Sequence, residues 1–401
     1  MDKRHGNKLV YNKHQASFLD LGDETAGIQK TDLRGFYMLF ILITSFYIVI
    51  SSFNKFYSVG YFVEDSFFWA MVQDGKFVAF VWPGAFLYTW LAFLLQLMIL
   101  KGFPLVLATI FQHLTQSLMF MIASYLALSR NWGFSQSLYI MMLTLTHFMK
   151  MHSYTLVNRD LRREYLKNPK NSQYPGNITM KNYFKFLITP ALVYQIEYPQ
   201  RQNFRVGYFF LKFILLLVQC VCMYMIISDS ILPVIQNSKS ISFLDMYARL
   251  IVSCVVLYNL GFLIIFEQIL NMFAELSYFA DREFYQNWWN CNGFEDFSRQ
   301  WNRPVHLFLL NHVYLECINE FNWSPQTAKY VTFLFSSLCH EMVVAVLCRK
   351  IAPFLFGLMM FQFPLMVMNR IINKKDFGTY LFWTGIITGP ALLLTCYVKV
   401  L

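Results

Sequence analysis

Long apolar runs recur along the chain and are separated by shorter polar stretches. Each run holds about 18–27 residues, which is the length that a helix needs to cross the hydrocarbon core of a bilayer. Strands of a membrane barrel would instead alternate apolar and polar residues at every second position. The pattern predicts an all-α polytopic membrane protein. We expect about nine transmembrane helices, at 36–53, 78–99, 103–128, 133–151, 208–234, 249–275, 327–348, 352–370 and 378–399.

Two stretches that are too polar to span, 152–206 and 276–326, interrupt this pattern. In the first, aromatic residues alternate with Lys and Glu, which is typical of amphipathic helices at the membrane interface. The second is dense in Trp, Tyr, Asn and His, and it is where we expect the chemistry. No Gly/Ser-rich linker or internal repeat divides the chain. We therefore predict a short cytosolic arm over 1–35 and one membrane domain over 36–401.

Composition and charge extend this interpretation. The chain is 57% hydrophobic and only 14% charged, whereas a soluble domain usually carries about 25% charged residues. The net charge of +10 bears on topology, and we expect no nucleic-acid partner. The stretch 152–206 holds nine Lys and Arg against three acids, so the positive-inside tendency places it in the cytosol. Four predicted spans precede it, which puts the N-terminus in the cytosol and, with nine spans, the C-terminus on the other side.

One predicted span, "FLFSSLCHEMVVAVL" (333–347), carries His340 and Glu341 side by side. Positions four apart share a helix face, so Thr332, Ser336 and His340 form one polar stripe. Histidine suits general-base work because its reference pKa is about 6.5 and burial favours the neutral ring. Facing a buried tunnel, His340 would deprotonate an alcohol dissolved in the membrane; the alternative is a histidine that only hydrogen-bonds across helices. Glu341 points about 100° away, and we expect it to pair with another helix.

The polar stretch 276–326 supplies further candidates. The Asn302 amide could hydrogen-bond a carbonyl or a developing oxyanion, with a helix cap or loop role as the alternative. The run "FYQNWWN" (284–290) could be an aromatic anchor at the headgroup level. His306 and His312 are six positions apart and share no helix face, so we expect no metal site there. The chain contains no nucleophile elbow, phosphate-binding loop, dinucleotide fingerprint or H-E-x-x-H motif.

Together these pieces resemble a known family. "FYQNWWN" is followed, twelve residues after its final Asn, by Asn302, then by "PVH" and, within a downstream apolar helix, by "HE". This order is similar to that of the membrane-bound O-acyltransferases, in the branch of the sterol and diacylglycerol O-acyltransferases, over about 148–401. "MKMHSY", "LVYQIEYP", "WNCNGFEDFSRQWN" and "FLLNHVY" look more like the fungal sterol enzymes than the diacylglycerol enzymes. The resemblance implies the fold of that family, with its helices around a buried catalytic tunnel.

The resemblance also implies roles for individual residues. His340 would be the catalytic base, and Asn302 would be its essential companion. The implied acyl-CoA contacts are Asp296, which is the weaker assignment, Arg299, Asn302, His306, Tyr314 and Ser336. The family motif would comprise Phe284, Tyr285, Asn287, Trp288, Trp289 and Asn290. At Asn287 the family has Asp, so this chain lacks a carboxylate near the implied entrance for coenzyme A.

The implied reaction transfers the acyl group of a long-chain acyl-CoA to the 3-hydroxyl of a membrane sterol, which gives a steryl ester and free CoA. Acyl-CoA would be a co-substrate, and neither a cofactor nor a metal is implied. The alternative acceptor is diacylglycerol. The resemblance further implies a multi-pass protein of the endoplasmic reticulum membrane, assembled as a dimer or tetramer. A transporter is disfavoured because the spans show no internal repeat and few charges, and a turnover assay would separate an enzyme from an inactive lipid-sensing scaffold.

Overall fold

The computed structural model describes residues 10–61, 65–372 and 375–400. In these ranges every regular element is a helix, and the only strand-like contacts are isolated β-bridges. The prediction of an all-α fold is therefore confirmed. The chain divides into two compact units, the first formed by 1–12, 71–199 and 304–351 and the second by 13–70, 200–303 and 352–401.

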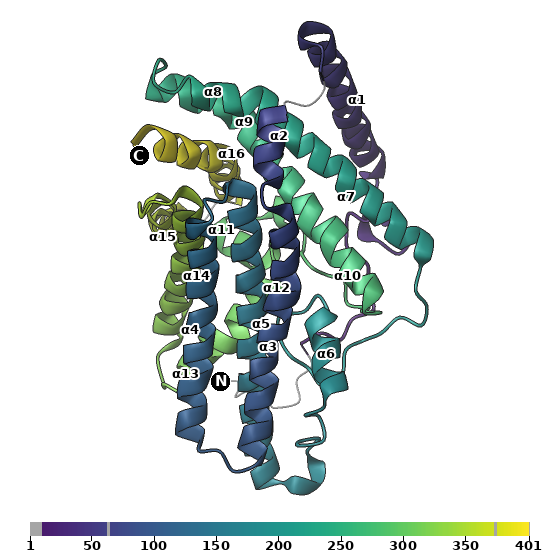
Figure 1. The fold of residues 1–401 in the computed structure, drawn as a ribbon, viewed down its shortest axis with the longest axis vertical. Coiled ribbons are helices and arrows are strands. Elements are labelled where there is room, and N and C mark those ends of the chain that lie inside the picture. The colour runs from purple at the N-terminus through teal and green to yellow at the C-terminus, as the bar shows by residue number, and fades with distance from the viewer. Residues whose placement is uncertain (1–9, 62–64, 373–374, 401) are drawn as a thin grey trace. The chain divides into compact units, whose positions relative to one another are not determined.

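The first unit is a bundle in which α5 packs against α3, α4 and α14 (Figure 1). Its buried core joins Ala123 and Ala127 of α4 to Ile140 and Met141 of α5, and to Val343 and Val346 of α14. The elements are α3 (Gly75–Leu100), α4 (Leu105–Ser129), α5 (Phe134–Lys167), η2 (Pro169–Asn171), α6 (Met180–Ile188), α12 (Arg303–Leu309), η6 (Leu310–Tyr314), α13 (Leu315–Asn319) and α14 (Pro325–Cys348).

Local signals set both ends of α14. The Ser324 side chain accepts a hydrogen bond from the Thr327 amide at 3.1 Å, and Pro325 occupies the first turn, where its missing N–H costs nothing. The helix ends at Arg349, whose left-handed backbone (φ 55°) stops it. The Arg349 guanidinium donates to the Asn131 side chain at 2.5 Å and therefore ties this end of α14 to the α4–α5 connection.

The second unit has its own core, in which α9 packs along α16 through Met246, Leu250, Cys254 and Ala391. Its elements are η1 (Gly27–Lys30), α1 (Arg34–Val59), α2 (Asp65–Val72, ending at the boundary), α7 (Val206–Ile226), η3 (Ile227–Ile231), α8 (Leu232–Gln236), α9 (Phe243–Phe262), η4 (Leu263–Ile269), α10 (Leu270–Leu276), η5 (Trp288–Asn290), α11 (Phe294–Gln300), α15 (Phe354–Ile372) and α16 (Lys375–Val400).

Eight helices in the described part of the chain are long and apolar enough to cross a membrane. They are Arg34–Val59, Phe67–Leu100, Leu105–Ser129, Val206–Gln236, Phe243–Leu276, Pro325–Cys348, Phe354–Ile372 and Asp376–Val400. The expected span 133–151 is not among them. It forms the first half of α5, whose inner face carries buried polar side chains such as Gln136, Ser137 and Thr144. Because α5 is enclosed by three neighbours, its polarity is compatible with the bundle interior.

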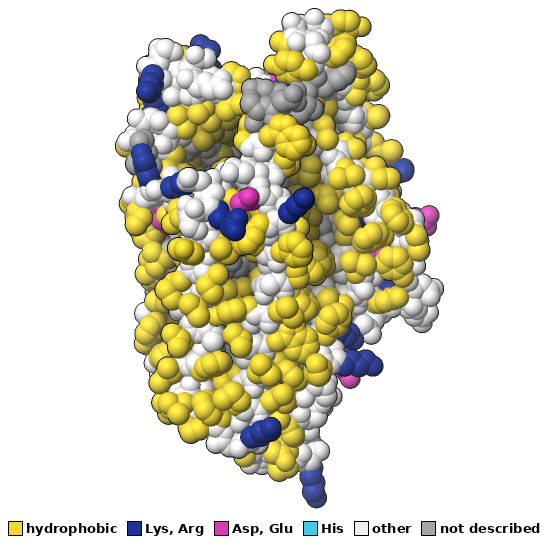
Figure 2. Space-filling view, in the orientation of Figure 1, with side chains coloured by type: hydrophobic (Ala, Val, Ile, Leu, Met, Phe, Trp, Pro, Cys, Tyr) yellow, Lys and Arg dark blue, Asp and Glu magenta, His cyan; other side chains and the backbone are white. Residues whose placement is uncertain are grey.

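The outer face of the first unit is apolar. Figure 2 shows hydrophobic side chains spread over the face formed by α3 and α4. On these two helices Phe80, Leu87, Val106 and Leu114 are each more than half exposed. In a soluble protein such a surface would be an aggregation site, whereas on a membrane-spanning bundle it is the face that meets lipid.

Three π-helical segments, η3, η4 and η6, interrupt otherwise regular helices. Each contains a buried polar side chain: Ser228 in η3, Glu267 in η4 and His312 in η6. The wider turn of a π-helix frees backbone groups and re-aims side chains, and such segments are frequent at functional sites. Two of these segments, η4 and η6, lie beside predicted site residues: Glu267 of η4 bonds to Tyr285, and η6 ends at Tyr314.

Candidate active site

His340 lies on α14, in the first unit, on the stripe that its sequence spacing predicts. Its Nδ1 atom lies 2.8 Å from the backbone oxygen of Ser336, and the Thr332 hydroxyl donates to the carbonyl of Ala328 in the preceding turn. The imidazole is exposed, Ser336 is half-buried and Glu341 is buried. From the sequence we expect a ring that faces a buried tunnel, whereas in the described residues the ring is exposed and lines neither of the two cavities given below.

The contact with Ser336 fixes the protonation pattern of the His340 ring. A backbone carbonyl can only accept a hydrogen bond, so Nδ1 must carry the proton. In the neutral ring the lone pair then resides on Nε2, the atom that points away from the backbone. In this arrangement Nε2 is the ring atom that is able to accept a proton.

Two other predicted residues of the first unit precede α14 in the chain. His306 lies on α12 and Tyr314 ends η6, and both side chains are half-buried. The segment η6 packs against α14, so the structure brings the element carrying Tyr314 next to the helix carrying His340.

Sequence reasoning missed a buried polar network at η6. The Tyr194 amide donates to the Ser153 hydroxyl oxygen at 2.7 Å, and Ser153 Oγ lies 2.7 Å from His312 Nε2. The Ser153 hydroxyl therefore links the backbone at Tyr194 to the imidazole of His312, and the tautomer of His312 decides which of the two groups donates. The "MKMHSY" segment, which includes Ser153, was the available signal, but its partners come from distant parts of the chain.

The same segment contains a buried lysine with a structural explanation. Lys150 Nζ donates to the carbonyls of Phe186 at 2.8 Å and Thr189 at 2.6 Å. These two oxygens belong to the end of α6, where a helix leaves its last carbonyls without partners. Lys150 therefore caps α6 and holds it against α5.

Asn302 and the motif 284–290 lie in the second unit. Asn302 is half-buried and sits between α11 and α12. The backbone on either side of it is bonded to the motif: the Arg303 amide donates to the Phe284 carbonyl at 2.9 Å, and the Gln286 amide donates to the Gln300 carbonyl at 2.8 Å.

Three motif aromatics are buried, Trp289 is half-buried and the two asparagines are exposed. Phe284, Tyr285 and Trp288 are buried, whereas Asn287 and Asn290 are exposed. The position where the family has Asp is therefore on the surface, and an amide there leaves no buried charge unpaired.

The motif is also bonded to the segment before the first span. The Tyr285 hydroxyl donates to a Glu267 carboxylate oxygen of η4 and accepts from the Leu19 amide at 2.8 Å. Burial, followed by the nearby Glu267 charge, raises the pKa of Tyr285 well above its usual value. Tyr285 therefore remains a neutral donor at physiological pH.

Arg299 and Asp296 occupy α11, with Arg299 exposed. The Arg299 guanidinium lies 3.2 Å from Asp296 and 3.7 Å from Glu295. Exposed ion pairs contribute only about 0–1 kcal/mol, so a phosphate could displace these carboxylates at little cost. Burial, with the Asp296 charge as a second cause, raises the pKa of the adjacent Cys291 thiol to about 12, which makes it a poor nucleophile at neutral pH.

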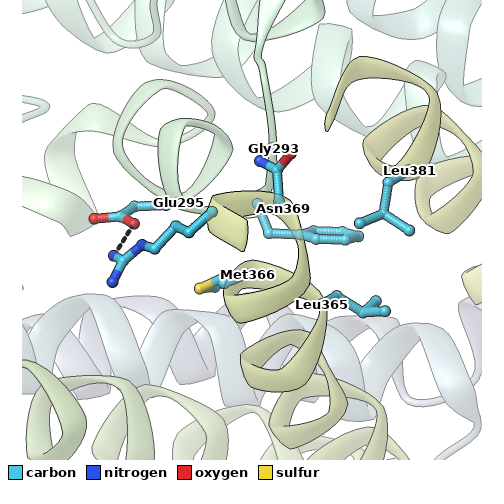
Figure 3. Close-up of a pocket in the computed structure, with 8 residues that line it drawn as sticks. Gly293, Glu295, Leu365, Met366, Asn369 and Leu381 are labelled. Carbon is cyan, nitrogen blue, oxygen red and sulfur yellow. Dashed lines mark hydrogen bonds and ion pairs between the residues drawn. The ribbon is translucent and has the colours of Figure 1, made fainter. Parts of the chain in front are cut away.

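Cavities in the described residues differ in size and chemistry. A cavity of about 30 Å³ lies where α11 meets α15 and α16, beside the ion pair of Glu295 and Arg370 (Figure 3). It has room for water but not for an acyl chain. A cavity of about 260 Å³ in the first unit has a largely hydrocarbon lining from α3, α4 and α5 that includes Phe77, Tyr88 and Met119. No group of His, Cys, Asp and Glu in the described ranges is arranged to hold a metal ion.

The candidate residues thus divide between the units. His306, Tyr314, Ser336 and His340 belong to the first, and Asp296, Arg299, Asn302 and the motif belong to the second. In the first unit the His340 ring is bonded to the Ser336 carbonyl. In the second unit backbone hydrogen bonds join the motif to Gln300 and Arg303 beside Asn302.

The sequence as a whole is similar to known proteins. The model of "MBOAT, membrane-bound O-acyltransferase family" matches residues 98–399. The chain is 36% identical over 238 residues to a sterol O-acyltransferase 2 of Candida albicans, covering 56% of this chain and 39% of that protein. It is 35% identical over 246 residues to sterol O-acyltransferase 2 of Saccharomyces cerevisiae, covering 57% and 38%. It is 32% identical over 285 residues to diacylglycerol O-acyltransferase 1A of Glycine max, covering 66% and 57%.

The chain spans about two fifths of the length of the two sterol O-acyltransferases that it matches. The match to the family model, by contrast, covers most of the chain. With eight candidate spans, this match identifies a multi-pass membrane protein. The chain belongs to the membrane-bound O-acyltransferase family.

Proposed function

We propose that the protein transfers the acyl group of a long-chain acyl-CoA to the 3-hydroxyl of a membrane sterol, with formation of a steryl ester and free CoA. The observation that carries the proposal is the His340 ring. Its Nδ1–H is held by the Ser336 carbonyl, so its basic Nε2 is presented from a helix that is apolar enough to span. A base at this depth suits an alcohol dissolved in the bilayer, and the similarity to sterol O-acyltransferases favours a sterol.

In the proposed reaction His340 Nε2 takes the hydroxyl proton as the sterol oxygen attacks the thioester carbonyl. A C–O bond forms and the carbonyl oxygen becomes an oxyanion, which the Asn302 amide stabilises. The C–S bond then breaks, and the CoA thiolate receives the proton from the His340 imidazolium. No acyl-enzyme is required, in keeping with the raised pKa of the Cys291 thiol.

The remaining assignments belong to the same proposal. Acyl-CoA is a co-substrate and no further cofactor takes part. Its contacts are those implied by the family motifs, namely Asp296, Arg299, Asn302, His306, Tyr314 and Ser336. The enzyme resides in the endoplasmic reticulum membrane with its N-terminus in the cytosol, and it acts as a homo-oligomer.

A second candidate acceptor is diacylglycerol. The match to the soybean diacylglycerol O-acyltransferase 1A covers more of this chain than the matches to the sterol enzymes, although identity is lower. The chemistry at His340 would be the same, because both acceptors offer an alcohol within the bilayer.

The test is to incubate membranes containing the protein with labelled oleoyl-CoA and either ergosterol or dioleoylglycerol, and to identify the labelled product. We expect steryl ester to dominate. Membranes containing the His340→Ala variant at equal abundance provide the control. Triacylglycerol as the only product would select the second candidate, and no ester from either acceptor would refute the proposed function.

A further inference from the structure

The backbone around Asn302 is clamped by the motif 284–290 from both sides. The bond from Gln286 to Gln300 lies two residues before Asn302, and the bond from Arg303 to Phe284 lies directly after it. The Arg303 side chain adds bonds at 3.0 Å each to the Asp281 carboxylate and to the Glu283 carbonyl. These bonds leave little freedom to the two residues, Trp301 and Asn302, that lie between Gln300 and Arg303.

Trp301 packs against five aromatic rings, of which Phe266, at 6.2 Å between centroids, is the most distant. The ring of Tyr258, on α9, stacks on it with centroids 4.6 Å apart and an interplanar angle of 14°. Phe262 and Trp288 each approach to 4.7 Å, and Phe297 to 5.2 Å. These separations are those of favourable aromatic pairs, each of which contributes about 0.5–1.5 kcal/mol beyond burial.

The four nearest rings come from three different parts of the second unit. Tyr258 and Phe262 are one turn apart on α9, Trp288 belongs to the motif, and Phe297 belongs to α11. Trp288 is itself buried and contacts Phe262 at 5.3 Å as well as Trp301. The aromatic face of the motif is therefore occupied by protein rings rather than being presented to a ligand.

We propose that Tyr258 and the motif Phe284–Asn290 are positioning elements that fix Asn302 for the reaction by clamping Trp301. This inference rests on the proposed function, because it gives the motif its purpose through the oxyanion-side amide of Asn302. On this inference the motif positions Asn302 and does not itself bind acyl-CoA. It also assigns a role to Tyr258, which lies outside every motif of the sequence.

The position of an amide that stabilises a transition state matters steeply, because a displacement of about 1 Å can cost about a hundredfold in rate. Loosening the clamp should therefore lower kcat and leave the KM for acyl-CoA nearly unchanged. Loss of a binding element would have the opposite effect, with KM raised and kcat retained.

The experiment compares four proteins in membranes with oleoyl-CoA and sterol. Tyr258→Leu removes the stacked ring and should lower kcat by about 10- to 100-fold, with KM for oleoyl-CoA within about twofold of the parent. Tyr258→Phe keeps the ring and should recover most of the parent's kcat. Phe354→Leu removes a ring that pairs with Tyr397 at 5.3 Å in the same unit, away from Trp301, and serves as the matched control.

A double-mutant cycle separates positioning from general destabilisation. In an Asn302→Ala background, measured by single turnover at high enzyme concentration, Tyr258→Leu should change the rate by less than about threefold, because the group it positions is gone. Equal losses in both backgrounds, or a rise in KM with kcat unchanged, would overturn the clamp while leaving the proposed function intact. A parent protein that forms no ester would instead overturn the proposed function and, with it, the clamp.

Discussion

At the scale of the residue, the chemistry of His340 depends on a bond within its own helix. The carbonyl of Ser336 accepts the Nδ1 proton, and this single contact determines which ring nitrogen is basic. The sequence could predict the stripe from the spacing of four. Which tautomer of His340 is present follows only from the position of the Ser336 carbonyl, and that position comes from the structure.

His340→Ala should abolish ester formation while the protein still inserts and accumulates. Loss of a general base typically costs about 10²–10⁴ in rate, so we expect turnover to fall by at least two orders of magnitude in membranes adjusted to equal protein content. Cys339→Ala, next to it on α14, is the matched control and should stay near the parent rate. A His340→Ala variant with more than about a tenth of parent turnover would exclude His340 as the base.

Asn302→Ala should lower turnover far more than it weakens the apparent affinity for acyl-CoA. An oxyanion-side donor acts mainly on the transition state and can contribute about 3–4 kcal/mol. The measurement is kcat and KM with oleoyl-CoA as the varied substrate. A raised KM with unchanged kcat would assign Asn302 to substrate binding instead.

Asn287→Asp should change activity by no more than a few-fold, because Asn287 is exposed and a carboxylate there would stay hydrated. Trp288→Ala should be far more damaging, since truncating a buried indole costs about 3–5 kcal/mol in stability. Initial rates and thermal unfolding in detergent of the two variants test both parts. An inactive parent that Asn287→Asp activates would favour the inactive scaffold for the natural chain.

At the scale of the element, α5 is the helix for which hydropathy and packing disagree. Its residues are too polar for a span by composition, yet α3, α4 and α14 enclose it. Its buried polar side chains find hydrogen-bond partners within the protein. One example is Lys150 of α5, which donates to the carbonyls of Phe186 and Thr189 at the end of α6. A helix that is shielded from lipid needs no apolar outer surface of its own.

We therefore expect α5 to cross the membrane. If it does, the connections before α4 and after α5 lie on one side and the connection between α4 and α5 lies on the other. Lys101→Cys and Lys170→Cys should then react with a membrane-impermeant thiol reagent from the same side, and Ser129→Cys from the opposite side. Labelling of the parent, which holds eight cysteines, gives the background. Labelling of Lys170→Cys together with Ser129→Cys would show that α5 does not cross.

At the scale of the whole molecule, long-range ion pairs bind the segment before the first span into the second unit. Asp23, which is buried, lies 3.1 Å from Arg201 and 2.8 Å from Arg205. Burial is the largest single influence and would raise the pKa of Asp23, but hydrogen bonds from Thr25 and the two arginines together hold it well below the usual value. Asp23 is thus a charged link between segments about 180 residues apart in the chain.

Asp23→Asn should lower the free energy of unfolding by about 1–3 kcal/mol, because it removes the buried carboxylate that pairs with both Arg201 and Arg205. The folded-state pKa lies below the unfolded value of about 3.9, so the contribution is complete above that value and disappears as pH falls through the folded pKa. In detergent, the difference between parent and variant in the free energy of unfolding should be constant from pH 8 to about 5 and shrink below about 4. The exposed neighbour Glu24 supplies the control, Glu24→Gln, which should show no difference. An equal loss in both variants would contradict the assignment.

The sequence alone determined that the helices lie in a lipid bilayer, that the fold is all-α and which residues are candidates for the site. Runs of apolar residues specify helices in lipid because a bilayer offers the backbone no partners, and this rule depends on local composition only. The spacing of Ser336 and His340 places them on one face for the same reason, since a helix turn is a local structure. The order of the motifs supplied the family.

The tertiary structure decided what these residues are bonded to. The pairing of Arg303 with Phe284, the stack of Tyr258 on Trp301 and the bond between Ser153 and His312 join residues that are separated by about 20 to 160 positions. The polar character of α5 was likewise explained only by its neighbours. Such contacts depend on how helices pack, and packing is set by shape and by buried polar partners rather than by any periodicity along the chain.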